Sequence, residues 1–187
     1  VIPSGTANEP IIDASTTIKS IEVENGATLT VNGTSRITLR GGDYINNGTV
    51  NFTGCGELRF VEGIGFNDPA HIAGNGNLCK IIIDNQNDII LETDVSISDV
   101  LEFKDGHLVL DSYNLTIEEN ATITNANANA YIITKNSPTA QNFISQYIDN
   151  NETLYPIGTS TAYTPVKISH QGSSQPYKIR VFEDVYD

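Results

Sequence analysis

Short apolar doublets, in which two apolar residues flank one other residue, recur along most of the chain. Successive doublets lie about six to eight residues apart where the pattern is regular. Because side chains alternate between the two faces of a strand, both apolar residues of a doublet point to one side. The pattern therefore predicts many short strands that each place two residues in a core. The doublets are Ile21/Val23, Leu29/Val31, Ile37/Leu39, Val50/Phe52, Leu58/Phe60, Ile81/Ile83, Val95/Ile97, Leu101/Phe103, Leu108/Leu110 and Leu115/Ile117.

The residues between the doublets are typical of tight turns. Asn25-Gly26, Asn32-Gly33, Asn47-Gly48 and Asp105-Gly106 each separate two apolar segments. Asn and Gly accept the positive φ that such turns need, whereas the abundant Ile and Thr favour strands. The composition therefore predicts an all-β chain.

Two architectures accept this pattern. In a sandwich or meander, neighbouring strands pair as hairpins, for which Asn-Gly is a strong signal. In a β-solenoid, each coil of roughly 20–25 residues stacks on the next one. A sandwich core about 10 Å thick needs longer alternating strands than these. We therefore predict a right-handed parallel β-solenoid with about three short strands per coil.

The two cysteines, Cys55 and Cys79, lie 24 residues apart, which is close to the length of one predicted coil. Residues stacked in adjacent coils are about 4.8 Å apart, near the lower part of the Cα separation that a disulfide tolerates. Two alternatives remain at this point: a disulfide between adjacent coils, or two unpaired buried cysteines.

The repeat divides the chain into two predicted parts. Residues 1–135 form the solenoid with its N-terminal entry segment, and residues 136–187 form a capping segment and a small, partial β-rich closing module. Residues 63–78 break the pattern and are expected to form a loop or a distorted strand. Weak helical spacing of Phe143, Ile144 and Tyr147 predicts a helical cover over the end of the solenoid, which otherwise exposes unpaired backbone.

Charge and hydropathy exclude several classes of partner. The chain of 187 residues has 23 acidic and 10 basic residues and a net charge of −13. This balance argues against nucleic acid and against anionic membrane surfaces, which both attract Lys and Arg. No apolar run approaches the ~18 residues of a membrane-spanning helix. Since Met is absent altogether and the sequence starts at Val1 without an initiator, we expect a processed or excised piece of a longer chain. We expect this piece to be monomeric.

Several segments together resemble a known type of module. Several segments occur in the same order as in β-helical repeat modules of large bacterial surface proteins that use the type nine secretion route. These segments are residues 1–6 and 18–31 at the start, 43–52, and the pair 155–159 and 163–166. The resemblance covers most of the chain. It implies an extracellular or cell-surface location and an adhesin-like or spacer role, with no catalytic motif to transfer. The cysteine pair and residues 63–78 depart from the usual pattern.

The chain lacks the residues that β-helical enzymes use. Polysaccharide lyases gather several carboxylates around Ca²⁺ beside a basic residue, and hydrolases need two suitably spaced carboxylates. Here no two Asp residues are adjacent, and His71, His107 and His170 are widely scattered. The run from Asp84 to Asp88 offers alternating oxygen ligands, but we interpret it as a solvated turn. We therefore predict no catalytic residue, no metal and no cofactor.

Tyrosines offer the one sequence signal for a ligand. Tyr113, Tyr131 and Tyr147 lie in the later part of the chain, and exposed tyrosine rings can stack on sugars. Burial at the end of the solenoid is the ordinary explanation for these residues, and sugar contact is the alternative. We predict a non-catalytic extracellular module with an adhesive or spacing role, whose partner is a glycan or a surface protein. The second candidate is a carbohydrate-binding or polysaccharide-processing accessory module.

Overall fold

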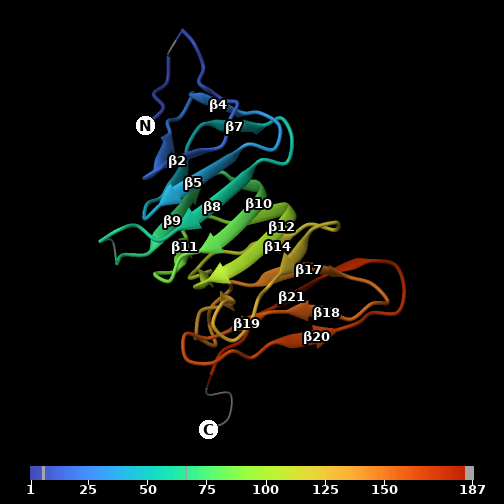
Figure 1. The fold of residues 1–187 in the computed structure, drawn as a ribbon. Helices are drawn as coiled ribbons and strands as arrows, with labels where there is room; N and C mark the ends of the chain where they lie inside the picture. Colours follow the sequence, from blue (N-terminus) through green and yellow to red (C-terminus); the bar gives the residue numbers. More distant parts are fainter. Residues whose placement is uncertain (6, 66, 184–187) are drawn as a thin grey trace.

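The computed structural model describes residues 1–5, 7–65 and 67–183, and within them it is all-β. Parallel strands stack into a β-solenoid of about seven turns. In Figure 1 the coils follow one another from the N-terminal end to the C-terminal end of an elongated stack. The predicted fold class, an all-β parallel solenoid with a small closing segment, is confirmed.

Three sheets run along the stack. The seven-stranded sheet contains β3 (Ile21–Val23), β6 (Tyr44–Asn46), β9 (Ala70–Gly74), β11 (Ile89–Leu91), β13 (Leu108–Val109), β16 (Ile132–Ile133) and β19 (Ile157–Gly158). The three-stranded sheet contains β1 (Ile11–Ile12), β4 (Thr28–Val31) and β7 (Thr49–Phe52). The nine-stranded sheet contains β2 (Thr16–Ile18), β5 (Arg36–Arg40), β8 (Glu57–Val61), β10 (Gly76–Asp84), β12 (Val95–Asp105), β14 (Leu115–Ile117), β15 (Thr122–Thr124), β17 (Ile144–Ile148) and β21 (Gln175–Ile179).

The apolar doublets form the core because equivalent positions of successive coils lie opposite each other. Ile37 pairs with Leu58, Leu58 with Ile81, and Ile81 with Leu101. All four side chains are buried and belong to one cluster that extends along the coils. Each doublet therefore packs on the doublets of the coils before and after it, so that the side chains fill the interior.

The three-stranded sheet ends at β7, and we call this place the sheet break. Residues Gly76–Leu78 at the start of β10 pair with Val95–Ile97 of β12, and only the later part of β10 pairs with β8. Among the described strands, β7 pairs with β4 alone. The irregular stretch predicted for residues 63–78 thus contains the connection from β8 to β9, all of β9 and the start of β10.

The C-terminal part adds antiparallel strands to the last coils. β17 stacks in parallel on β14, but β21 then pairs with β17 in the antiparallel sense. β18 (Thr153–Tyr155) and β20 (Val166–Ile168) form a separate antiparallel pair beside them (Figure 1). The predicted boundary at residue 135 stays a prediction.

The helical cover predicted from the spacing of Phe143, Ile144 and Tyr147 is wrong. Ile144 and Ile148 belong to strand β17, and both are buried. β14 offers an edge with unpaired backbone groups, and a strand satisfies these groups whereas a helix does not. This tertiary pairing outweighs the weak local helical spacing of the segment.

Candidate functional site: the disulfide and its groove

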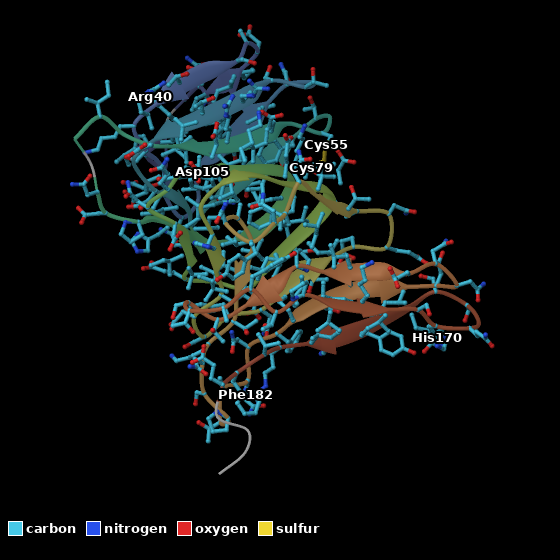
Figure 2. The ribbon with its side chains drawn as sticks, turned by 60° about the horizontal axis from the view of Figure 1, so that its bottom comes forward. Arg40, Cys55, Cys79, Asp105, His170 and Phe182 are labelled. Atoms are coloured by element: carbon cyan, nitrogen blue, oxygen red, sulfur yellow. A yellow bond between two sulfur atoms is a disulfide. The ribbon has the colours of Figure 1, made fainter. Side chains whose placement is uncertain are left out.

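A disulfide links two coils at the sheet break. Cys55 lies just before β8 and Cys79 lies within β10, with their Cα atoms 5.4 Å apart. Both residues are half-buried. Figure 2 shows the pair on the solenoid, away from His170, which lies between β20 and β21. The bridge therefore connects the last coil of the three-stranded sheet to the first coil that follows the break.

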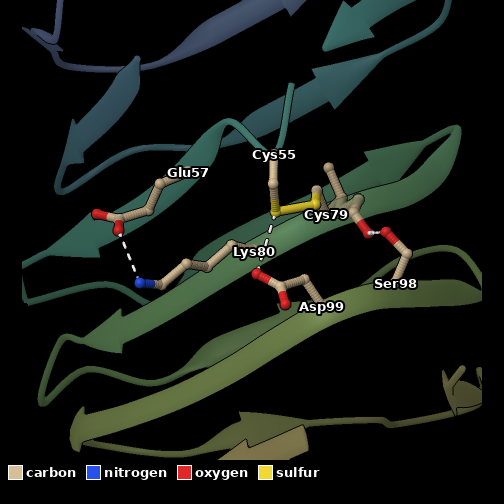
Figure 3. The surroundings of a disulfide bond; sticks show 7 residues. Cys55, Glu57, Cys79, Lys80, Ser98 and Asp99 are labelled. Carbon is tan, nitrogen blue, oxygen red and sulfur yellow. Dashed lines mark hydrogen bonds and ion pairs between the residues drawn. A yellow bond between two sulfur atoms is a disulfide. The ribbon is translucent and has the colours of Figure 1, made fainter. Parts of the chain in front are cut away.

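A β-bulge places a carboxylate against this disulfide. Leu78 pairs with Ile97 and Lys80 pairs with Val100, so Ser98 and Asp99 of β12 both lie opposite Cys79. The extra residue redirects a side chain, which is a common effect of bulges. Asp99 Oδ2 lies 3.2 Å from Cys55 Sγ (Figure 3). A bonded sulfur carries no proton, so this contact is not a hydrogen bond while the disulfide is intact.

A groove of about 590 Å³ runs beside the disulfide along the sheet break. Phe52 of β7 borders it on one side, and Asn77 of β10 and Ser96 of β12 border it on the other. Ser96 donates a hydrogen bond to Glu118, which also lines the groove. The Phe52 ring packs against the backbone of Gly56, where any added Cβ would overlap the ring. The groove thus combines one aromatic ring with amide, hydroxyl and carboxylate groups.

Two histidines show the same local arrangement elsewhere on the solenoid. Asp43 Oδ1 accepts a hydrogen bond from the backbone N–H of His71 and lies 3.0 Å from its Nδ1. Asp88 Oδ1 accepts from the backbone N–H of His107 and lies 2.8 Å from its Nδ1. In both pairs a carboxylate of one coil orients the histidine of the next coil. The sequence separations differ, at 28 and 19 residues, so spacing alone does not reveal the motif.

The tyrosines predicted to contact sugars do not form a common surface. Tyr131 is only 4% exposed, and its hydroxyl donates to the backbone oxygen of Thr159 at 2.7 Å. Burial, and then the nearby charge of Asp88, raise the pKa of Tyr131. Tyr131 therefore cannot stack on a sugar from solvent, and of the two interpretations of this residue burial is the one that the structure shows. Tyr113 is half-buried against the core, and Tyr147 lines a separate cleft of about 320 Å³.

The acidic run at residues 84–88 uses its polar groups within the solenoid. Asp84 pairs with Arg59, and Asp88 holds His107. Asn85 Oδ1 accepts from the backbone N–H of Asn87 at 3.0 Å, which fixes the turn. These contacts give both carboxylates a partner from another coil.

Comparisons with protein-family models, with curated proteins and with solved structures found no match. Within the described residues, no helix has the length and apolar character needed to span a bilayer.

Proposed function

We propose that this chain is a non-catalytic extracellular module of a larger bacterial surface protein, in which it spaces or displays adhesive parts. The observation that carries the proposal is the seven-turn parallel stack with one core along its length. Stacked coils pair their backbone groups with both neighbours, so the array is stiff and keeps its two ends apart. These are the properties that a stalk or a wall of a surface protein requires.

The disulfide supports the proposed location. Disulfides persist in oxidising compartments and are rare in reducing ones. The bridge between Cys55 and Cys79 therefore favours a compartment outside the cytoplasm. The resemblance of the opening and closing motifs to β-helical modules of type nine secreted proteins points to the same place.

Surface labelling tests this proposal. Antibodies raised against the purified chain should label intact cells of the organism that encodes it, and external protease should remove the label. The purified chain should also release no products from a panel of polysaccharides. Label that appears only after lysis would overturn the location, and cleavage of a polysaccharide would overturn the non-catalytic role.

The groove favours a second candidate, a carbohydrate-binding module. Sugar sites combine an aromatic ring for stacking with a few polar groups that fix orientation. Phe52 and Asn77 supply such groups on opposite sides of the sheet break. On a glycan array, a binding chain should lose its signal when Phe52→Ala and Asn77→Ala are introduced. The matched control is Asn67→Ala, in an exposed connection between β8 and β9.

A further inference from the structure

Three side chains with metal-ligating atoms converge at the sheet break. Cys55 Sγ, Cys79 Sγ and a carboxylate oxygen of Asp99 all lie within 4.8 Å of one another. They come from three successive coils, because Cys55 precedes β8, Cys79 lies on β10 and Asp99 lies on β12. Figure 3 shows the carboxylate directed at the disulfide from below. The coil stacking, rather than a flexible loop, brings the three groups together.

The disulfide is accessible to reductants. Cys79 lines the groove, both cysteines are half-buried, and Asp99 is exposed. When a dithiol reduces the bridge, the S–S bond breaks and each sulfur gains one electron and one proton. The dithiol loses two electrons and two protons and becomes a disulfide. The product is a pair of thiols beside a carboxylate, and this pair lies across two coils that remain joined through β8 and β10.

We propose that the reduced form binds a thiophilic divalent cation such as Zn²⁺ through Cys55, Cys79 and Asp99. Thiolates and carboxylates are both ligands of four-coordinate zinc, and a water molecule completes such a site. The two thiols release their protons on binding, since the thiolate is the ligand. The site is therefore closed by oxidation and opened by reduction, and it requires no part of the proposed extracellular role.

The backbone geometry suits this site. Two thiolates at about 2.3 Å from a tetrahedral zinc are roughly 3.7 Å apart. Side-chain rotation alone can provide that separation, because the Cα atoms are 5.4 Å apart. Asp99 Oδ2 already lies 3.2 Å from Cys55 Sγ, as two ligands of one metal ion do.

The neighbouring cation does not compete for these ligands. Lys80 follows Cys79 on β10, but its ammonium lies 3.2 Å from Glu57 (Figure 3). It also lies 3.9 Å from Glu102. Two thiolates and one carboxylate carry three negative charges at close range. Their mutual repulsion is strong without a cation between them, so these three groups attract a divalent cation. Metal binding should accordingly weaken as the pH falls, because protons compete for the sulfurs.

Cobalt spectroscopy tests the proposal. The chain is reduced with a phosphine, desalted without oxygen and titrated with Co²⁺. We expect a complex of one cobalt per chain with sulfur-to-cobalt charge-transfer absorption and the visible bands of tetrahedral Co²⁺, which Zn²⁺ then displaces. The oxidised chain and the double variant Cys55→Ser/Cys79→Ser should give none of these bands. Asp99→Asn should weaken the affinity about 10-fold or more, by analogy with the loss seen when other groups around a metal are removed.

The controls separate this site from chance thiol binding. Asp68→Asn, which changes an exposed carboxylate of the connection between β8 and β9, should leave the affinity unchanged. The reduced chain should keep its β-sheet circular dichroism, and in denaturant the tetrahedral cobalt bands should disappear. The proposal is overturned if the reduced chain gives no charge-transfer band, if Asp99→Asn binds as well as the original chain, or if reduction itself unfolds the coils.

Discussion

The chain enters the nine-stranded sheet in two different ways along the solenoid. In the second and third coils, a four-residue turn separates the strands, at residues 32–35 before β5 and at residues 53–56 before β8. In the next two coils no turn interrupts the chain at this corner, because β10 and β12 each continue through it as one long bent strand. A β-bulge accommodates the extra residue of β12 opposite β10. The sheet break lies between the coils that contain a four-residue turn and the coils that contain a long continuous strand.

This difference explains why the groove and the disulfide occur together. A turn and a bent strand follow different paths, so the strands on either side of the break do not pair, and a groove opens between them. The core does not share this discontinuity. Phe60 pairs with Ile83, and Ile83 pairs with Phe103, in one buried column that crosses the break. The coils thus differ at one corner while they share an interior.

Truncation of this column should produce the largest effect. Phe60→Ala lies before the break and Phe103→Ala after it, and both rings are fully buried. Each substitution should lower the free energy of unfolding by about 3–5 kcal/mol, since it removes apolar contacts and leaves a cavity. Urea denaturation should show a single transition in both variants. Two separate transitions in Phe103→Ala would mean that the coils on the two sides of the break unfold independently.

A surface substitution controls for nonspecific effects. Ile64 is 90% exposed in the connection between β8 and β9, so Ile64→Ala should change the free energy of unfolding by less than about 0.5 kcal/mol.

Loss of the disulfide should have the next largest effect. The bridge closes a loop of 24 residues, for which the chain-entropy model gives about 3 kcal/mol. The double variant Cys55→Ser/Cys79→Ser should therefore unfold at lower urea concentration than the oxidised chain, with chelator present to exclude metals. Reductant should destabilise the original chain and leave the variant unchanged. Equal stability of the oxidised chain and the variant would show that the break needs no covalent link.

Two glycines with positive φ test how closely the coils approach at their corners. Gly33, in the turn before β5, has φ of 58° and open space where a Cβ would lie. Gly106, after β12, has φ of 78°, and a Cβ there would overlap the backbone oxygen of Asn85 in the coil before it. Gly33→Ala should cost about 1 kcal/mol from the strained φ alone. Gly106→Ala should cost at least about 1 kcal/mol more, measured by urea denaturation. Equal losses would contradict the close approach at Gly106.

The sequence predicts the core better than it predicts the corners. Doublets such as Ile37/Leu39 and Leu101/Phe103 are fully buried as expected, because their period of two is a local property. Val50/Phe52 follows the same rule, yet both residues are only half-buried, since β7 lies at the sheet break. Whether a strand has a neighbour depends on the path of the next coil, which no local pattern contains.

The sequence predicts the candidate site only to the same extent. The separation of Cys55 and Cys79 matches one coil, which left the bridge open as one of two alternatives. The position of Asp99 depends on a bulge in β12, and the pair of Asp43 with His71 depends on the long connection within its coil. Sugar contact and burial were both open for Tyr131, and its hydroxyl donates to the backbone oxygen of Thr159 inside the fold. Each of these contacts joins coils whose lengths differ, so sequence spacing does not predict them.

The smallest expected effect is on the pH dependence of the free energy of unfolding. This dependence distinguishes the solenoid from its closing segment. Burial raises the pKa of Tyr44 in β6 above its ordinary value, and in β18 it raises the pKa of Tyr155 to about 12. Unfolded tyrosine ionises near pH 10, so between about pH 10 and 12 the folded chain binds more protons than the unfolded chain. The free energy of unfolding should therefore fall as the pH rises through this range.

Tyr155→Phe separates the two regions in this experiment. It removes the hydroxyl whose single proton is shared between the backbone oxygens of Gln146 and Tyr177, so it should lower the stability at pH 8 by about 1 kcal/mol. It should also make the decline above pH 10 shallower, because one of the buried phenols no longer ionises on unfolding. Urea denaturation at intervals between pH 8 and 11.5 measures both quantities. A decline as steep as that of the original chain would mean that Tyr44 and the solenoid, rather than Tyr155 and the closing strands, set the alkaline limit.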